Sequence, residues 1–224
     1  MDDFINFSNL YELLEIYQTN LNSNSIKFEK ENYFVSQLKY EKIPIVGKNV
    51  ARFLYLISYI VQPKNILEIG FGSGYSSYAI YNAINDKKKL NFISLERNYI
   101  RYERGIKFIK SKGLNIKLYF EDFDELVLFF KENILFDFVF VDSVKKNYLS
   151  IFFKIINMVR SGGIIIFDNI FFDKKVIKLT KNNIPKYCDT SNKLNYFNHY
   201  ISKRKDIIVN FINIDDGIAL CIKK

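Results

Sequence analysis

A regular alternation of short apolar segments and helical patterns runs from residue 65 to residue 167 and constrains the fold more than any other feature. The apolar segments predict five strands, at residues 65–69, 91–95, 116–120, 136–141 and 163–167. The intervals predict helices over residues 75–84, 97–112, 124–132 and 148–159. Because strand–helix–strand units form right-handed crossovers between parallel strands, the alternation predicts an α/β, doubly wound, mostly parallel sheet.

The N-terminal part of the chain differs from this core. Apolar residues at helical spacing predict helices over residues 4–21 and 47–61, the second of which ends before Pro63. Because 224 residues fit one large domain, we predict a single domain. Its N-terminal helical addition covers residues 1–62, and its α/β core covers residues 63–224.

The C-terminal part predicts a β-hairpin. Apolar segments at residues 207–214 and 218–222 flank the turn sequence Asp215-Asp216-Gly217. These two strands bring the expected sheet to seven strands, with an antiparallel pair at its end.

Composition gives only general indications of the binding partners and the cellular location of the protein. The net charge of +9 favours an anionic partner such as nucleic acid, although lysines scattered through a Lys-, Asn- and Ile-rich chain are also typical of a solvated surface. The acidic start MDDFINFSNL lacks the basic region of a signal peptide, so we expect none there, and the longest apolar stretches are too short to span a bilayer. We therefore expect a cytoplasmic protein without a membrane partner. Two cysteines far apart and one histidine predict neither a disulfide nor a zinc site.

A glycine-rich turn follows the first predicted strand in the segment ILEIGFGSGYSS. Gly70, Gly72 and Gly74 allow a tight turn and a close approach of the backbone to a ligand. The dinucleotide-binding pattern is absent, since Tyr75 occupies the place of its third glycine. The carboxylate of Glu68, just before the turn, would repel a pyrophosphate. The turn therefore predicts a ligand that carries a cation or hydroxyl groups.

Two further acids lie at the same edge of the predicted sheet. Glu96 ends the second strand, 22 residues after Gly74, where an acid typically binds ribose hydroxyls. Asp122 follows the third strand. Because ligands of doubly wound sheets bind at the carboxyl ends of the strands, Glu68, Glu96 and Asp122 beside a glycine turn are predicted to contact a ligand rather than to be surface residues.

The next two strands end in oxygen-bearing side chains. Asp142 closes the fourth strand, and Asp168 and Asn169 close the fifth. Two carboxylates and an amide carbonyl suit Mg²⁺ or Mn²⁺. The alternative is that Asp168 and Asn169 only turn the chain, as these residue types often do. Asp137, earlier in the fourth strand, is expected to face a polar edge.

Several segments together resemble the metal-dependent O-methyltransferases. The resemblance rests on ILEIGFGSGYSS, ISLERN, FDFVFVDSVKKNYLSIFFKIINMVRSGGIIIFDNIFF and DDGIALCIKK, and it runs from about Lys42 to the C-terminus. That family includes catechol and caffeoyl-CoA O-methyltransferases and bacterial tRNA 5-hydroxyuridine methyltransferases. The chain departs from the family pattern at Phe71, at Ser143, at the segment 145–147 and at Asp215, where the family has glycine. These departures affect the shape of the substrate pocket.

The resemblance implies S-adenosylmethionine as cofactor, with Glu96 on the ribose and Asp122 near the adenine. The implied cofactor-binding set is Glu68, Gly70, Gly72, Gly74, Ser76, Glu96, Asp122 and Asp142. It also implies Mg²⁺ or Mn²⁺ bound by Asp142, Asp168 and Asn169, with Lys145 as the general base. Lys146 is expected to be a surface lysine.

A metal that chelates the acceptor selects two adjacent oxygens, as in a catechol or in 5-hydroxyuridine. The segment EKIPIVGKNVARFLYLI and the C-terminal residues resemble the tRNA-modifying branch more, which favours 5-hydroxyuridine in tRNA. The basic residues that follow Glu96, and the Lys203-Arg204-Lys205 cluster, could bind RNA phosphates or could simply be solvated. The alternatives are a small catechol-type or caffeoyl-CoA-type acceptor, or a non-catalytic protein that binds the cofactor or RNA. We also expect a homodimer.

Overall fold

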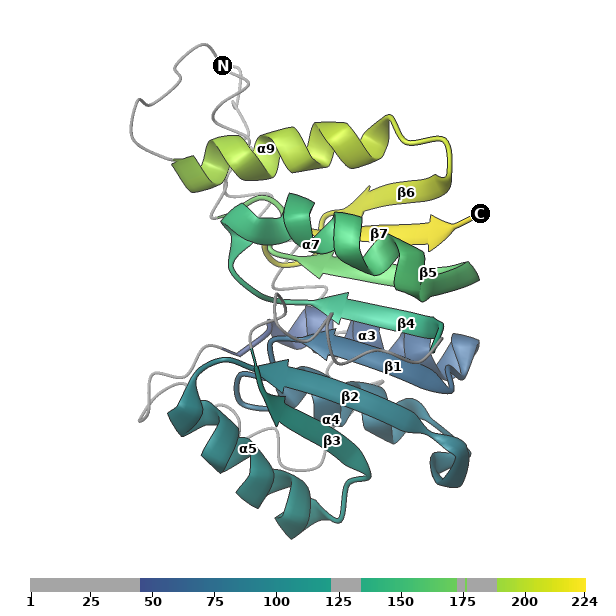
Figure 1. The fold of residues 1–224 in the computed structure, drawn as a ribbon, viewed down its shortest axis with the longest axis vertical. Coiled ribbons are helices and arrows are strands. Elements are labelled where there is room, and N and C mark those ends of the chain that lie inside the picture. The colour runs from purple at the N-terminus through teal and green to yellow at the C-terminus, as the bar shows by residue number, and fades with distance from the viewer. Residues whose placement is uncertain (1–44, 122–133, 173–175, 177–188) are drawn as a thin grey trace, which may run out of the picture.

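The computed structural model describes residues 45–121, 134–172, 176 and 189–224. Within these residues, seven strands form one sheet in the order β3-β2-β1-β4-β5-β7-β6 (Figure 1). The strands are β1 (Asn65–Ile69), β2 (Asn91–Glu96), β3 (Ile116–Phe120), β4 (Phe136–Val141), β5 (Val159–Asp168), β6 (Ile207–Ile212) and β7 (Ile218–Lys223). The first five are parallel, and β7 runs antiparallel to both β5 and β6. This confirms the predicted doubly wound sheet with its C-terminal antiparallel pair.

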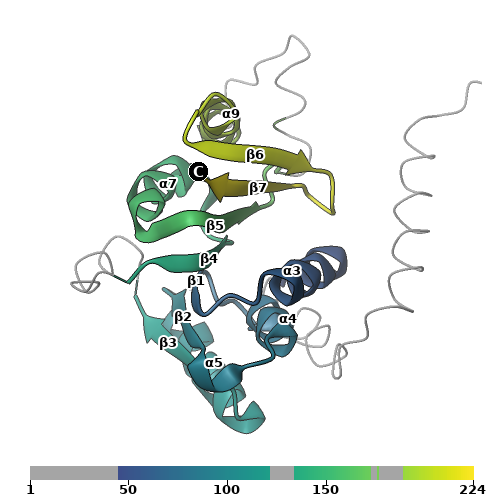
Figure 2. The same cartoon turned by 90° about the vertical axis from the view of Figure 1, so that its right-hand side faces the viewer.

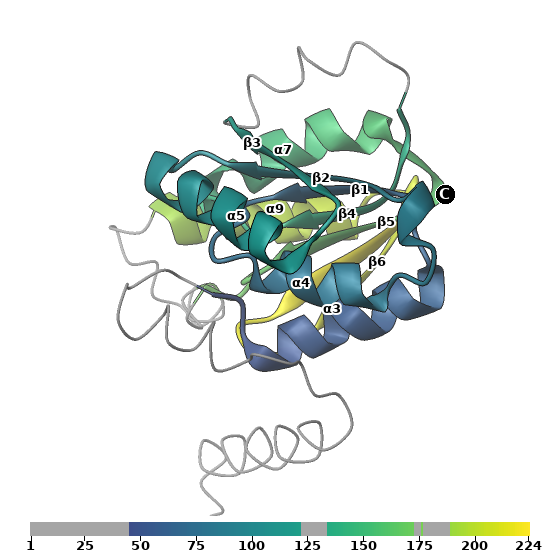
Figure 3. The same cartoon turned by 90° about the horizontal axis from the view of Figure 1, so that it is seen from below.

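Helices cover both faces of the sheet, as Figure 2 and Figure 3 show from two directions. One face carries α3 (Lys48–Val61), α4 (Tyr75–Ala83) and α5 (Tyr99–Lys112), and the other carries α7 (Tyr148–Ile155) and α9 (Asp189–Ser202). Side chains of β4 alternate between the two cores. Phe138 and Phe140 pack with α3 and α4, while Val139 and Val141 pack with α7 and α9.

Two expectations about the helices needed correction. The helix predicted over residues 148–159 ends at Ile155 and continues as a short 3₁₀ turn, because β5 already begins at Val159. Helix α9 was not predicted, although Leu194, Phe197 and Ile201 lie at helical spacing and are buried. The helices predicted over residues 4–21 and 124–132 lie outside the described residues.

Asp137 lies near the amino end of β4, at the edge of the sheet opposite the carboxyl ends where the site is predicted. Its carboxylate accepts hydrogen bonds from the backbone N–H groups of Lys64 and Asn65, both at 2.8 Å, and from Nε of Arg160 at 2.5 Å. Burial alone would raise the pKa of Asp137, but these partners hold it below its ordinary value. Asp137 therefore anchors the start of β1, and the expectation of a polar edge is consistent with this geometry.

Helix α3 is tied to the C-terminal hairpin at Asp215. Gly47 precedes the helix and offers no side-chain cap; instead, Asp215 accepts hydrogen bonds from Val50 N at 3.2 Å and Asn49 Nδ2 at 3.0 Å. A Cβ at Gly47 would lie 1.8 Å from Oδ2 of Asp215, so the close contact requires glycine. The division of the domain at residue 62 stays a prediction, but α3 shares its core with the sheet.

Candidate active site

The glycine turn lies against the carboxyl ends of β1, β2 and β4. The N–H groups of Gly70 and Phe71 both donate to the carbonyl oxygen of Leu95, at 3.0 and 2.9 Å. Gly70 has φ +105°, and a Cβ there would lie 2.0 Å from the carbonyl oxygen of Asp142. Only glycine fits both this conformation and this approach, so the backbone of Asp142 lies directly beside the glycine turn.

Glu96 is held by the turn that it faces. One carboxylate oxygen accepts from Gly72 N at 2.9 Å, and the other accepts from Asn98 N at 2.8 Å. The side chain is buried but lines a pocket. Because each carboxylate oxygen has two lone pairs, both can still accept a hydrogen bond from a ligand hydroxyl.

Glu68 lies behind the turn rather than in the pocket. Its carboxylate is fully buried and accepts hydrogen bonds from the hydroxyls of Ser76 at 2.6 Å, Ser94 at 2.5 Å, and Ser77. Burial raises the pKa of Glu68 to about 7; the serine hydroxyls oppose this shift, and the charge of Asp142 adds to it. Glu68, predicted to bind the cofactor, therefore supports the turn, β2 and α4 from behind the pocket.

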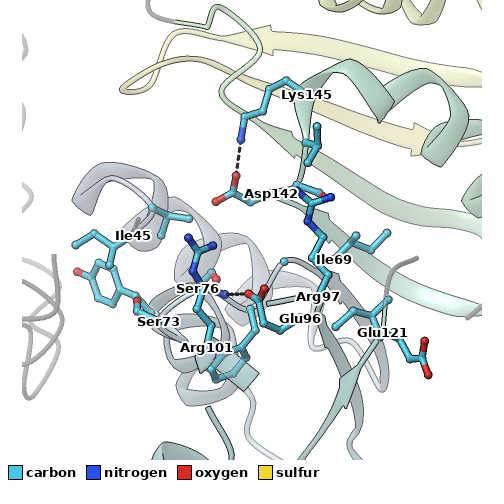
Figure 4. A pocket seen from close by; sticks show the side chains of 18 residues that line it. Ile45, Ile69, Ser73, Ser76, Glu96, Arg97, Arg101, Glu121, Asp142 and Lys145 are labelled. Atoms are coloured by element: carbon cyan, nitrogen blue, oxygen red, sulfur yellow. Dashed lines mark hydrogen bonds and ion pairs between the residues drawn. The ribbon is translucent and has the colours of Figure 1, made fainter. Parts of the chain in front are cut away.

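The pocket opens at these strand ends, between the glycine turn, the segment before α3 and the end of β4 (Figure 4). Gly70, Gly72, Ser76, Glu96 and Asp142 line it together with Lys145. Gly74 packs instead against Phe71 and Phe108, where a Cβ would clash. Asp122 lies outside the described residues. Arg97 and Arg101, two of the basic residues that follow Glu96, also line the pocket. Lining residues that the sequence did not point to include Ile45, Val46, Ser73, Glu121 and Val144.

Asp142 and Lys145 form an ion pair at the end of β4. Lys145 Nζ lies 2.6 Å from Oδ1 of Asp142, and both side chains are partly buried (Figure 4). Burial by itself would lower the pKa of Lys145, but the neighbouring Tyr148 and Asp142 raise it above its ordinary value. Lys146, by contrast, is exposed.

Asp168 lies at the end of β5 with an unusual carboxylate. The residue is 1% exposed; Oδ1 accepts from Asn169 N at 2.8 Å, and Oδ2 has no hydrogen-bond partner among the described residues. Burial and then the charge of Asp142 raise the pKa of Asp168. The hydroxyl of Tyr148 donates its single hydrogen to the backbone carbonyl of Asp168 at 2.8 Å, with the carbonyl oxygen of Val141 a weaker, shared acceptor at 3.3 Å, which ties the ends of β4 and β5 together.

These groups fit a hard divalent cation. A buried carboxylate oxygen without a partner, close enough to a second carboxylate to feel its charge, is stabilised by a cation between them. Asn169 adjoins them in the left-handed conformation, at φ +53°. In the described ranges no three His, Cys, Asp or Glu side chains cluster as a metal site; the predicted set has two carboxylates and one amide. Its role as a metal site stays a prediction.

The sheet order and the helices on both faces form a Rossmann-like methyltransferase fold, and solved structures share it. The chain resembles the solved O-methyltransferase TomG from Streptomyces achromogenes, in complex with SAM, at a TM-score of 0.79 and 20% identity, covering 94% of this chain and 96% of that one. It also resembles the Bacillus cereus O-methyltransferase in complex with SAH, at a TM-score of 0.77 and 22% identity, covering 92% and 97%.

The sequence model of the O-methyltransferase family matches residues 24–224, so the chain belongs to this family. Tapetum-specific methyltransferase 1 of Arabidopsis thaliana is 30% identical over 174 residues, which cover 75% of this chain and 73% of that protein. Caffeoyl-CoA O-methyltransferase of Medicago sativa is 28% identical over 183 residues, which cover 76% and 71%. The comparisons confirm the O-methyltransferase family and the assignment as an enzyme, whereas metal dependence and the tRNA branch stay predictions.

None of the helices in the described ranges combines the length and apolar character that a membrane span requires. The cytoplasmic location and the homodimer stay predictions.

Proposed function

We propose that this O-methyltransferase transfers the methyl group of S-adenosylmethionine to a hydroxyl that neighbours a second oxygen on its acceptor, with the aid of Mg²⁺ or Mn²⁺. The observation that carries the proposal is the arrangement at the end of β4. There, Asp142 lines the pocket beside the glycine turn, pairs with Lys145, and lies close enough to Asp168 to raise its pKa.

In this proposal the cofactor occupies the pocket along the glycine turn. Glu96 accepts hydrogen bonds from the ribose hydroxyls, because it lines the pocket and each of its carboxylate oxygens can accept a second hydrogen bond. Gly70 and Gly72 let the backbone approach the ligand, while Glu68 and Gly74 act from behind the turn. Asp122 is proposed near the adenine by resemblance alone.

The cation would be held by Asp142, Asp168 and Asn169. When bound, it lowers the pKa of the acceptor hydroxyl, which is otherwise a poor nucleophile at neutral pH. Lys145 takes the hydroxyl proton at Nζ, and this requires that its pKa fall from the raised value that Asp142 helps to maintain. Because Asp142 would share its charge with a bound cation, its stabilisation of the Lys145 ammonium would weaken.

The acceptor is a vicinal dioxygen compound, for which two classes have support. Named relatives include caffeoyl-CoA O-methyltransferases, which favours a small catechol-type acceptor. Arg97 and Arg101 line the pocket, and Arg104, Lys107 and Lys110 are exposed on α5, which favours 5-hydroxyuridine in a tRNA loop. The second basic cluster supports RNA less, since Arg204 pairs with Asp206.

The test compares acceptors with labelled S-adenosylmethionine. Purified protein is incubated with tRNA that carries 5-hydroxyuridine and, separately, with catechol and caffeoyl-CoA, at low and moderate salt. Transfer to tRNA should weaken steeply with salt, and transfer to a small catechol should not. Labelling of the small acceptors alone would assign the catechol class, and labelling of none would contradict the proposed chemistry.

Adjacent lysines provide a matched pair of variants. Lys145→Ala should lower the methyl-transfer rate by roughly 10²-fold to 10⁴-fold, the range for loss of a general base. Lys146→Ala removes an exposed lysine one residue away and should retain the rate. Equal rates for the two variants would remove Lys145 from the mechanism.

A further inference from the structure

Three aromatic side chains form an exposed cluster at one end of the sheet. Tyr99 and Tyr102 lie at the start of α5, and Phe120 ends the outer strand β3 (Figure 1). The ring centroids of Tyr99 and Phe120 are 5.5 Å apart, and those of Tyr102 and Phe120 are 5.7 Å apart. Tyr99 is 60% exposed and Phe120 is 46% exposed. Single exposed aromatic residues are common, but a contiguous exposed cluster indicates a binding surface.

The cluster adjoins the pocket without lining it. Arg97 and Arg101, which lie on either side of Tyr99 in the sequence, line the pocket (Figure 4). Glu121, which follows Phe120, also lines it. Among the described residues that form the pocket wall, none belongs to the aromatic cluster. A ligand that extends from the pocket past these residues would meet the cluster, whereas a ligand held within the pocket would not.

The charge around the cluster is strongly positive. Residues 97–121 contain seven Lys and Arg residues and two Glu residues, a net charge of +5 out of +9 for the whole chain. More than half of the net charge therefore falls within a short segment, which lysines scattered evenly over the surface would not produce. The exposed cations of this segment are Arg97, Arg104, Lys107, Lys110 and Lys117.

An RNA strand with unpaired bases fits this combination of groups. Unpaired bases stack on aromatic rings, while Lys and Arg side chains bind the phosphates between them. A second copy of the chain fits less well, because a symmetric contact would place the same positive charge opposite itself. The centre of a protein–protein interface is also generally poor in lysine.

We propose that Tyr99, Tyr102 and Phe120 form a platform on which an unpaired base of an RNA strand stacks, while the cations of α5 bind the neighbouring phosphates. The inference rests on the proposed function in that it selects RNA from the two acceptor classes. The platform binds a base outside the pocket, so RNA binding and methyl transfer can be measured separately.

A single tryptophan reports on stacking at the platform. The chain contains no tryptophan, so Tyr99→Trp introduces one fluorescent indole there. A single-stranded RNA of about ten nucleotides should quench it, and an RNA duplex of the same length should quench it much less, because its bases are paired. Tyr59→Trp is the matched control, since Tyr59 is 53% exposed on α3, and its fluorescence should change little. Equal quenching in the two variants, or by the two RNAs, would overturn the inference.

Affinity at several salt concentrations separates stacking from charge. Tyr99→Ala should weaken binding of the single strand by about fivefold or more without changing its dependence on salt, and Tyr99→Phe should retain most of the affinity. Arg104→Ala combined with Lys107→Ala should instead flatten the dependence on salt, because phosphate contacts are lost. Wild-type affinity in Tyr99→Ala, or wild-type salt dependence in the double variant, would contradict the inference.

Two further measurements separate the remaining outcomes. A changed oligomeric state of Tyr99→Ala in sedimentation, without RNA, would assign the cluster to an interface between copies and overturn the inference. If the wild type binds the single strand but methylates neither tRNA nor small catechols, the proposed function fails and the platform stands. If it methylates small catechols and does not bind the single strand, the platform fails and the proposed chemistry stands.

Discussion

Glu68→Gln tests whether a buried carboxyl group under the cofactor turn sets part of the pH dependence of stability. The glutamine side chain has nearly the same shape but cannot ionise. Ser76, Ser77 and Ser94 can rotate their hydroxyls to pair with its amide, so the network can be retained. The variant therefore removes the charge with little change in packing.

The expected magnitude follows from the shift in pKa. Burial raises the pKa of Glu68 from 4.5 to about 7. At about 1.4 kcal/mol for each pKa unit, the difference amounts to roughly 3 kcal/mol of unfolding free energy. Because the folded state binds this proton more tightly, the contribution is fully present below about pH 4.5 and is lost as the pH rises through about 7.

Urea unfolding of both proteins near pH 5 and near pH 8 measures the effect. The stability of Glu68→Gln relative to wild type should rise by about 2–3 kcal/mol over this interval, since only wild-type Glu68 becomes charged. Asp168, whose pKa is also raised, contributes equally to the pH dependence of both proteins, so its contribution cancels when their unfolding free energies are subtracted. Ser94→Ala removes one hydrogen-bond donor to the ionised Glu68 carboxylate. In this variant the unfolding free energy should therefore fall more steeply with pH than in the wild type. Parallel curves for wild type and Glu68→Gln would refute the reasoning.

Three further predictions concern the cofactor, the metal and the hairpin. Glu96→Ala should weaken binding of S-adenosylmethionine by on the order of 1.5–3 kcal/mol, and unchanged affinity in calorimetry would remove Glu96 from the site. EDTA should abolish methyl transfer and Mg²⁺ or Mn²⁺ should restore it, whereas full activity in metal-free Asp168→Ala protein would rule the metal out. Asp215→Ala should lower the unfolding free energy by roughly 1 kcal/mol, because the variant loses the cap of α3. In this background Gly47→Ala should lower the unfolding free energy less than in wild type, because the carboxylate that its Cβ would meet is gone. Equal costs in the two backgrounds would contradict this contact.

Periodicity was sufficient to predict the parallel core. The strands β1 (NILEI) and β4 (FDFVFV) are mostly apolar, and four residues of β1 and five of β4 are buried, as expected for strands covered on both faces. Periodicity placed the start of β5 wrongly, because tertiary packing overrides the local pattern there. Strand β5 begins at Val159 because this residue pairs with Phe136, and the sequence does not reveal that contact. Helix α9 was missed because polar residues dominate it, although its buried residues keep helical spacing.

The site was predictable in its charged residues but not in its hydrogen bonds. Strand ends and glycine spacing were sufficient to place Glu96 and Asp142 at one pocket. The sequence could not reveal that Glu68 faces three serines instead of the pocket, because Ser94 comes from β2 and Ser76 from α4. For the same reason the sequence did not point to Ser73, whose buried hydroxyl has no hydrogen-bond partner among the described residues, because this depends on the folded surroundings.

The two aspartates of β4 show why position along a parallel strand decides what a carboxylate does. Asp137 lies at the amino end of the strand, where Arg160 and two backbone N–H groups satisfy it fully. Asp142 lies just past the carboxyl end, where the crossovers leave a pocket open and Lys145 is its charged partner. At the amino end the carboxylate stabilises the sheet, since its partners lower its pKa. At the carboxyl end it stays available to a ligand, which is the condition that the proposed chemistry requires.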